Sequence, residues 1–150
     1  MAGRKFSAVV TDEAFSAAAT ETVVQVVAGT NHAFKVLGWG IAFAGTGVTD
    51  EPIRIELLRQ TTAGTSSALT IVDWQPTADT LDSSALDSFT VEPTAGDILS
   101  ATRTHPQAGY EIWYPEGKEP ESAAAGRIGI RIITPTGVNP NASAYMVCEE

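Results

Sequence analysis

Side chains that could carry out chemistry are few and widely spaced in this sequence of 150 residues. The two histidines, His32 and His105, are far apart in the chain, and the single cysteine is Cys148. A protein metal site needs several histidine, cysteine or carboxylate ligands that converge on one ion, which this spacing does not favour. No Gly-x-Ser-x-Gly motif occurs, and no histidine lies near Cys148 in sequence to act as its base. These residues therefore predict no metal site and no nucleophilic site.

Carboxylates are plentiful, with 18 Asp and Glu residues in the chain. Glycoside hydrolysis needs only two of them, but nothing in their spacing selects a pair, so scattered surface acids are the better interpretation. The glycines on either side of Trp39 do not form a phosphate-binding loop, because they lie inside a predicted strand rather than between a strand and a helix. We therefore expect a protein that is not an enzyme and that has no cofactor.

Aromatic residues are the remaining candidates for a site. Trp74, Tyr110, Trp113 and Tyr114 lie at the ends of predicted strands or beside loops. Exposed Trp and Tyr side chains anchor protein interfaces or stack on sugar rings. They also cap the rim of a hydrophobic core, and the sequence leaves these three interpretations open.

The strands that must position these residues are clearest between residues 33 and 65. Successive side chains of a strand point to opposite faces, and one face of the first strand is bulky, with Leu37, Trp39, Ile41 and Phe43. The other face is almost bare, with Gly38, Gly40 and Ala42. A glycine-lined strand face predicts close approach by a second sheet or by a neighbouring subunit.

Three further segments alternate in the same way. Residues 53–57 place Ile53, Ile55 and Leu57 on one face and Arg54 and Glu56 on the other, as in a strand with one face in water. Residues 127–134 set three isoleucines against a glycine and an arginine. Residues 110–114 place Tyr110, Ile112 and Tyr114 opposite Glu111 and Trp113.

The whole chain contains roughly eight to ten such short strands, separated by turn signals and without a convincing amphipathic helix. Candidate strands also cover residues 5–10, 21–28, 68–74, 98–104 and 142–148, residues 85–91 are a weaker candidate, and residues 76–84 are expected to form a surface loop. This pattern predicts an all-β fold, an antiparallel two-sheet sandwich of jelly-roll type, with an immunoglobulin-like sandwich as the alternative.

Length and charge limit the classes of function. We expect one domain over residues 1–150, because a chain of this size buries roughly 70% of its unfolded surface without a disulfide or metal. The formal net charge of −9 disfavours nucleic acid as a partner. No apolar run approaches the ~20 residues that span a membrane, and the N-terminal residues lack the features of a signal peptide. The expectation is a soluble protein made in a cytoplasm.

Three segments of the sequence resemble a known family. They are KVLGWGIAFAGTGVTDEPIRIELLRQTTAGTSSAL, EPTAGDILSATRTHPQAGYEIWYPEGKE and GRIGIRIITP. They are similar to small proteins of the structural gene blocks of tailed bacteriophages, the capsid decoration (cement) proteins and related head-surface proteins of β-sandwich or jelly-roll fold. The resemblance covers most of the chain from about residue 21, and residues 76–88 match least. Its motifs have no known chemical role.

The resemblance implies a non-enzymatic virion protein, made in the host bacterial cytoplasm and located on the capsid surface. Such proteins commonly form homotrimers and lock neighbouring subunits of the major capsid protein together. On this reading residues 1–8 are a flexible or capsid-contacting arm, with Arg4, Lys5 and Phe6 as contacts, unless the terminus is merely frayed. The remaining candidate contacts with the capsid or a second subunit are Gly38, Gly40, Trp74, Tyr110, Trp113 and Tyr114.

An alternative function is a carbohydrate- or host-receptor-binding sandwich of the virion. In that case Trp74, Tyr110, Trp113 and Tyr114 would form one stacking platform for a sugar. A sandwich-fold hydrolase or metal enzyme is the least favoured function.

Overall fold

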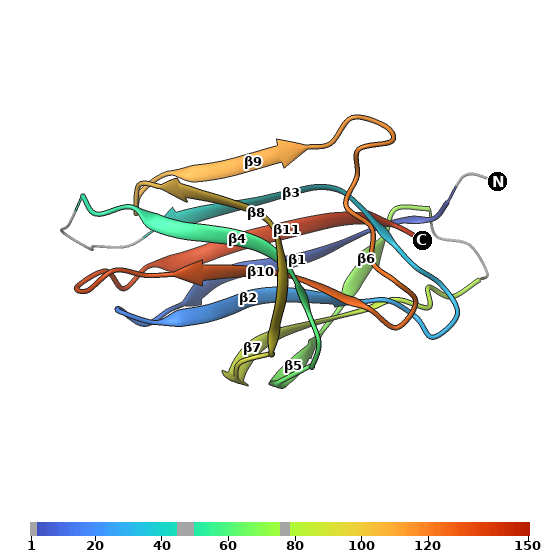
Figure 1. Ribbon diagram of the computed structural model, residues 1–150, viewed down its shortest axis with the longest axis horizontal. Helices are drawn as coiled ribbons and strands as arrows, with labels where there is room; N and C mark the ends of the chain where they lie inside the picture. Colours follow the sequence, from blue (N-terminus) through green and yellow to red (C-terminus); the bar gives the residue numbers. More distant parts are fainter. Residues whose placement is uncertain (1–2, 45–49, 76–78) are drawn as a thin grey trace.

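The computed structural model describes residues 3–44, 50–75 and 79–150, and in these residues it consists of β-strands joined by turns and loops (Figure 1). None of them forms a helix that could cross a membrane. The described strands are β1 (Lys5–Ala14), β2 (Thr20–Val27), β3 (Lys35–Ala44), β4 (Ile53–Gln60), β5 (Thr65–Leu69), β6 (Ile71–Asp73), β7 (Ser84–Val91), β8 (Ala95–Thr104), β9 (Gly109–Trp113), β10 (Arg127–Ile133) and β11 (Asn141–Glu149).

The strands form two antiparallel sheets that pack face to face. Sheet A has the order β6-β1-β11-β3-β9, and sheet B has the order β5-β7-β2-β10-β4-β8. With the three short or inserted strands β5, β6 and β7 set aside, the orders β1-β11-β3-β9 and β2-β10-β4-β8 are those of an eight-strand jelly roll. The predicted all-β, two-sheet antiparallel sandwich is confirmed, and its strand order is that of the first choice.

The core lies between the inner faces of the two sheets. Its largest fully buried side chains include Trp39, Phe6, Phe34 and Met146, together with Ile53 and Ile55 of β4 and Ile128, Ile130 and Ile132 of β10. The predicted inward positions of β4 and β10 are confirmed, because each of those isoleucines is fully buried. Burial of such side chains is the main favourable contribution to folding, about 1.5–3 kcal/mol for each one.

The bulky face predicted for β3 needs one correction. Trp39, Ile41 and Phe43 are in the core, but Leu37 is only half-buried, and Val36 takes the inward position instead. The cause is a β-bulge, since Val147 and Cys148 of β11 are consecutive but pair with Gly38 and Val36. One extra residue on β3 reverses the alternation at that point.

The segment between β4 and β8 also differs from the prediction. Residues 68–74 do not form one strand, because β5 pairs with β7 in sheet B and β6 pairs with β1 in sheet A. The chain therefore crosses from one sheet to the other within this segment. Residues 84–91 form β7, which confirms the weaker strand candidate over residues 85–91, and β7 pairs with β2 and β5. Residues 76–78 of the predicted loop lie outside the described residues.

Residues 5–8 are not a flexible arm. They begin β1, which pairs with β11 on one side and β6 on the other. Phe6 is fully buried, and the backbone of Arg4 exchanges hydrogen bonds of 2.9 and 3.0 Å with Glu150. The Arg4 side chain forms an ion pair with Asp73. Burial of the apolar Phe6 side chain in the core is more favourable than its exposure on a free arm, so Phe6 is not available as a surface contact. Residues 1–2 lie outside the described part.

Candidate functional site

The outer face of sheet A carries the most distinctive surface of the described structure. Side chains that lie directly opposite each other on neighbouring strands form rows across a sheet. One row on this face runs through Val72, Ser7, Val147, Gly38 and Trp113, from β6 to β9. The next row runs through Val9, Tyr145, Gly40 and Glu111.

Large apolar side chains on this face are exposed to solvent. Val9 is 43% exposed, Val72 55%, Trp74 50% and Trp113 50%. Val147, in the middle of its row, is buried although it does not belong to the core cluster. Val9, Val72 and Trp74 lie on or directly after the neighbouring strands β1 and β6, and exposed apolar side chains grouped in this way are typical of an interaction surface.

Two aromatic rings lie over the glycines of β3. A Cβ atom built on Gly38 would be 2.6 Å from Cδ2 and Cε3 of Trp113, and one on Gly40 would be 2.7 Å from Cε1 of Tyr145. The two ring centroids are 6.4 Å apart, with an angle of 36° between the ring planes. The bare face of β3 was predicted to be approached closely by a second sheet or a neighbouring subunit; within this chain, aromatic side chains from β9 and β11 of the same sheet lie over Gly38 and Gly40.

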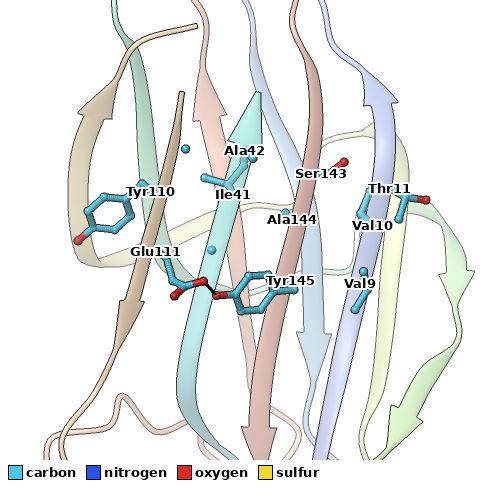
Figure 2. A pocket seen from close by; sticks show the side chains of 12 residues that line it. Val9, Val10, Thr11, Ile41, Ala42, Tyr110, Glu111, Ser143, Ala144 and Tyr145 are labelled. Atoms are coloured by element: carbon cyan, nitrogen blue, oxygen red, sulfur yellow. Dashed lines mark hydrogen bonds between the residues drawn. The ribbon is translucent and has the colours of Figure 1, made fainter. Parts of the chain in front are cut away.

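Glu111 holds the edges of both rings. Nε1 of Trp113 donates a hydrogen bond of 3.2 Å to Oε1 of Glu111. The Tyr145 hydroxyl donates to Oε2 of the same carboxylate, as Figure 2 shows. Burial raises the pKa of Tyr145 to about 12, and the hydrogen bond and negative charge of Glu111 act in the same direction. We call Trp113, Tyr145 and Glu111 the aromatic platform.

A groove with a volume of about 410 Å³ adjoins the aromatic platform. Figure 2 shows the Tyr145 side chain reaching from β11 across β3 toward Glu111, with Val9 and Thr11 on β1 at the opposite wall of the groove. The floor is made of small residues, including Ala42 and Gly109, and of Ser143. The Oγ atom of Ser143 accepts a 2.9 Å hydrogen bond from the backbone N–H of Asp12.

The structure does not bring the four predicted aromatic residues together. Tyr110 and Tyr114 face the core, where Tyr110 packs 5.3 Å from Trp39 between ring centroids and the Tyr114 hydroxyl accepts a 3.2 Å bond from Trp39 Nε1. Trp113 points outward, as the alternation of residues 110–114 indicates. Trp74 follows β6 at the opposite edge of sheet A, with its Nε1 donating to Ser7 Oγ at 3.1 Å.

Sequence reasoning missed two members of the platform. Tyr145 lies in a predicted strand and Glu111 in a predicted alternation, but neither was identified as a site residue. The signal that would have found them is the pairing of Gly40 with both Tyr145 and Glu111. Strand register of this kind depends on the positions of bulges and turns, and the sequence does not show them directly.

The residues considered for catalysis or metal binding lie apart from one another. His32 Nδ1 is 3.2 Å from Asp82 Oδ2, and His105 Nε2 is 3.3 Å from Asp50 Oδ1, both at exposed positions. Among the described residues no group of three His, Cys, Asp or Glu side chains is placed to hold a metal ion. Cys148 is buried in the core, and burial raises the pKa of its thiol well above the usual range.

Comparison with known proteins adds little to this description. No protein-family model matches the chain. No curated protein matches it. Two solved structures align with 99% of this chain at 16% identity: the T=1 particles derived from infectious bursal virus, with a TM-score of 0.28, and the VP2 subviral particle of infectious bursal disease virus, with a TM-score of 0.26. The chain spans 40% and 42% of those two viral chains, and TM-scores of this size do not establish a shared fold.

Proposed function

We propose that this chain is a structural protein of a virion, a decoration protein that binds the outside of a major capsid shell and reinforces it as a homotrimer. The role is non-enzymatic. The observation that carries the proposal is the exposed apolar outer face of sheet A, with Val9, Val72, Trp74 and Trp113. Jelly-roll sandwiches occur in viral capsid domains, although a fold alone does not determine function.

Reinforcement follows from many modest contacts rather than from one strong one. A stable protein interface buries about 800 Å² per partner. A decoration protein repeats such an interface over the whole shell, so that weak local binding sums to a large resistance to rupture. In a homotrimer, each subunit also uses two different patches to contact its neighbours, and the rotation between them closes the ring.

The carbohydrate- or receptor-binding alternative predicted a single platform of Trp74, Tyr110, Trp113 and Tyr114. Tyr110 and Tyr114 pack against the core, and Trp74 and Trp113 lie at opposite edges of sheet A. This arrangement gives a sugar no common stacking surface on those four residues, so we do not propose this function.

The test measures oligomeric state and binding to phage heads. Light scattering of the purified protein should give three times the chain mass of 15.7 kDa. The protein should also sediment with heads of the phage whose structural genes include this sequence, and a cryo-EM map of that virion should place it on the outer shell. A monomer that does not sediment with these heads would rule the proposal out.

A matched pair of variants tests the surface. Val72 on sheet A and Val91 on sheet B are 55% and 58% exposed. Val72→Glu should reduce binding to the heads at least about tenfold, which corresponds to ~1.4 kcal/mol. Val91→Glu should bind as the unmodified protein does. Equal effects of the two substitutions would place the contact somewhere other than the outer face of sheet A.

A further inference from the structure

The aromatic platform is held in place before any partner arrives. Trp113 and Tyr145 cannot move closer to the sheet, because their rings already lie against Gly38 and Gly40. Both rings are also tied at their edges by hydrogen bonds to Glu111. Trp113 nevertheless remains 50% exposed. Rigid aromatic surfaces of this kind bind a guest with little further loss of side-chain entropy.

The charge of Glu111 is the second feature of the platform. Glu111 is exposed, and its two oxygens each accept one hydrogen bond from a neutral donor, Trp113 or Tyr145. In the described structure no lysine, arginine or histidine lies within ion-pair distance of it. Each carboxylate oxygen has a second lone pair that can accept another hydrogen bond. The faces of the aromatic rings also carry negative potential.

We propose that Trp113, Tyr145 and Glu111 bind the guanidinium group of an arginine side chain presented by another protein. The planar guanidinium stacks on the exposed ring faces and donates to the free lone pairs of the Glu111 carboxylate. Its methylene stem lies over the near end of the adjoining groove of about 410 Å³, against Gly109 and Ala42, the pair of residues next to Glu111 and Gly40 on β9 and β3. Complementary charge supports this guest, since the chain carries a net charge of −9 and this carboxylate has no cationic partner of its own in the described residues.

Other guests fit these features less well. The phosphates of a nucleic acid are repelled by an acidic chain and by Glu111 itself. A neutral sugar would cover Glu111 without compensating its charge, and desolvation of an uncompensated carboxylate is unfavourable. A lysine ammonium is a point charge that lacks the planar surface for stacking and the paired donors of arginine. The assignment of the arginine to a capsid shell rests on the proposed function. The binding of a guanidinium group at this site does not depend on that function.

The direct test uses N-acetyl-L-arginine amide as the probe and NMR of the ¹⁵N-labelled protein. The indole N–H signal of Trp113 should shift saturably, while that of Trp74, equally exposed on the same sheet, should stay in place. N-acetyl-L-citrulline amide, which has nearly the same shape without the charge, should bind at least about tenfold more weakly. Equal shifts with the two probes, or equal shifts at Trp74 and Trp113, would overturn the proposal.

Variants separate the contributions of charge and stacking. Glu111→Gln should abolish the preference for the arginine probe over the citrulline probe. Trp113→Ala should weaken binding of the arginine probe at least about tenfold. Trp74→Ala is the matched control and should bind the arginine probe normally. Thermal unfolding of each variant checks that the fold is intact.

A second arm of the titration replaces the arginine probe with methyl glycosides. Saturable binding of a methyl glycoside that is tighter than that of the arginine probe would show a sugar site and overturn the proposal. If the arginine probe binds as expected but the protein does not bind phage heads, the site stands and the capsid function fails. If the heads bind and the probe does not, the capsid function stands and the site is wrong.

Discussion

Gly38 and Gly40 shape the surface of sheet A by having no side chain. Their positions leave room for the rings of Trp113 and Tyr145 to lie over β3 rather than stand away from it. A residue with a Cβ atom at either position on this face of β3 would occupy that space. The exposed rings and the position of Glu111 therefore depend on two residues that have no chemistry of their own.

Gly40→Ala should destabilise the protein. The new Cβ would be 2.7 Å from Cε1 of Tyr145, so the ring must shift, which strains its packing and its hydrogen bond to Glu111. Overpacking of this kind costs about 1–3 kcal/mol. Urea unfolding measures the loss, and Ala42→Ser, exposed on the same strand face, should change the free energy of unfolding by less than ~0.5 kcal/mol. Unchanged stability of the Gly40 variant would show that the ring contact is not tight.

Tyr145 should make stability depend on pH in the alkaline range. Its folded-state pKa is raised to about 12 from the ordinary tyrosine value of 10.0, so the folded state favours the neutral phenol. This contribution to stability is fully present below pH 10 and is lost as the pH rises from 10 toward 12. The free energy of unfolding should therefore fall over that range, and Tyr145→Phe should flatten the fall. A profile for the variant that is identical to that of the unmodified protein would contradict the assignment.

The strands β4 and β10 carry an ion-pair network on the outer face of sheet B. The alternation of residues 53–57 predicts that Arg54 and Glu56 face water, but Glu56 is only 1% exposed. Its Oε1 forms an ion pair with Nη2 of Arg54 at 2.8 Å, and its Oε2 accepts hydrogen bonds from Nε and Nη2 of Arg131. Long arginine side chains from two strands thus cover a carboxylate on a nominally exposed sheet face.

Glu56→Ala should be strongly destabilising. It leaves the partly buried Arg131 guanidinium without a counter-charge, and loss of one partner from a fully buried pair costs about 3–5 kcal/mol. Since Arg54 is 39% exposed, solvent screening reduces the expected loss of unfolding free energy to about 2–3 kcal/mol. Thermal or urea unfolding measures the effect. Glu121→Ala removes a carboxylate that is 60% exposed and should change stability by less than ~1 kcal/mol. Similar losses for both variants would mean that the Glu56 network is no stronger than a surface pair.

At the scale of the whole molecule, alternation and turn signals were enough to predict the two-sheet sandwich and most of its inward residues. Alternation reports which face a side chain takes, and this decides burial. It does not report which strands are neighbours. The bulge at Leu37, the crossing between β5 and β6 and the pairing of Gly40 with Tyr145 all depend on register. The aromatic platform could therefore not be assembled from the sequence, although Trp113 could be placed on the outer face.

The first and last strands, β1 and β11, are neighbours in sheet A, so the sandwich closes only after nearly the whole chain is in place. Pairing of strands so distant in sequence makes folding slow. Cys148 lies at this closure, fully buried and paired with Phe6.

The rate at which a reagent labels this single thiol reports how often the sandwich opens. A thiol reagent can reach it only when β11 separates, so labelling of the native protein should be at least about a thousandfold slower than labelling of the urea-unfolded chain. Labelling followed by mass spectrometry at several reagent concentrations gives the rate and free energy of that opening. Fast labelling under native conditions would show that β11 frays on its own. A slow rate would let Cys148 report, without any introduced dye or tag, how firmly the protein stays closed.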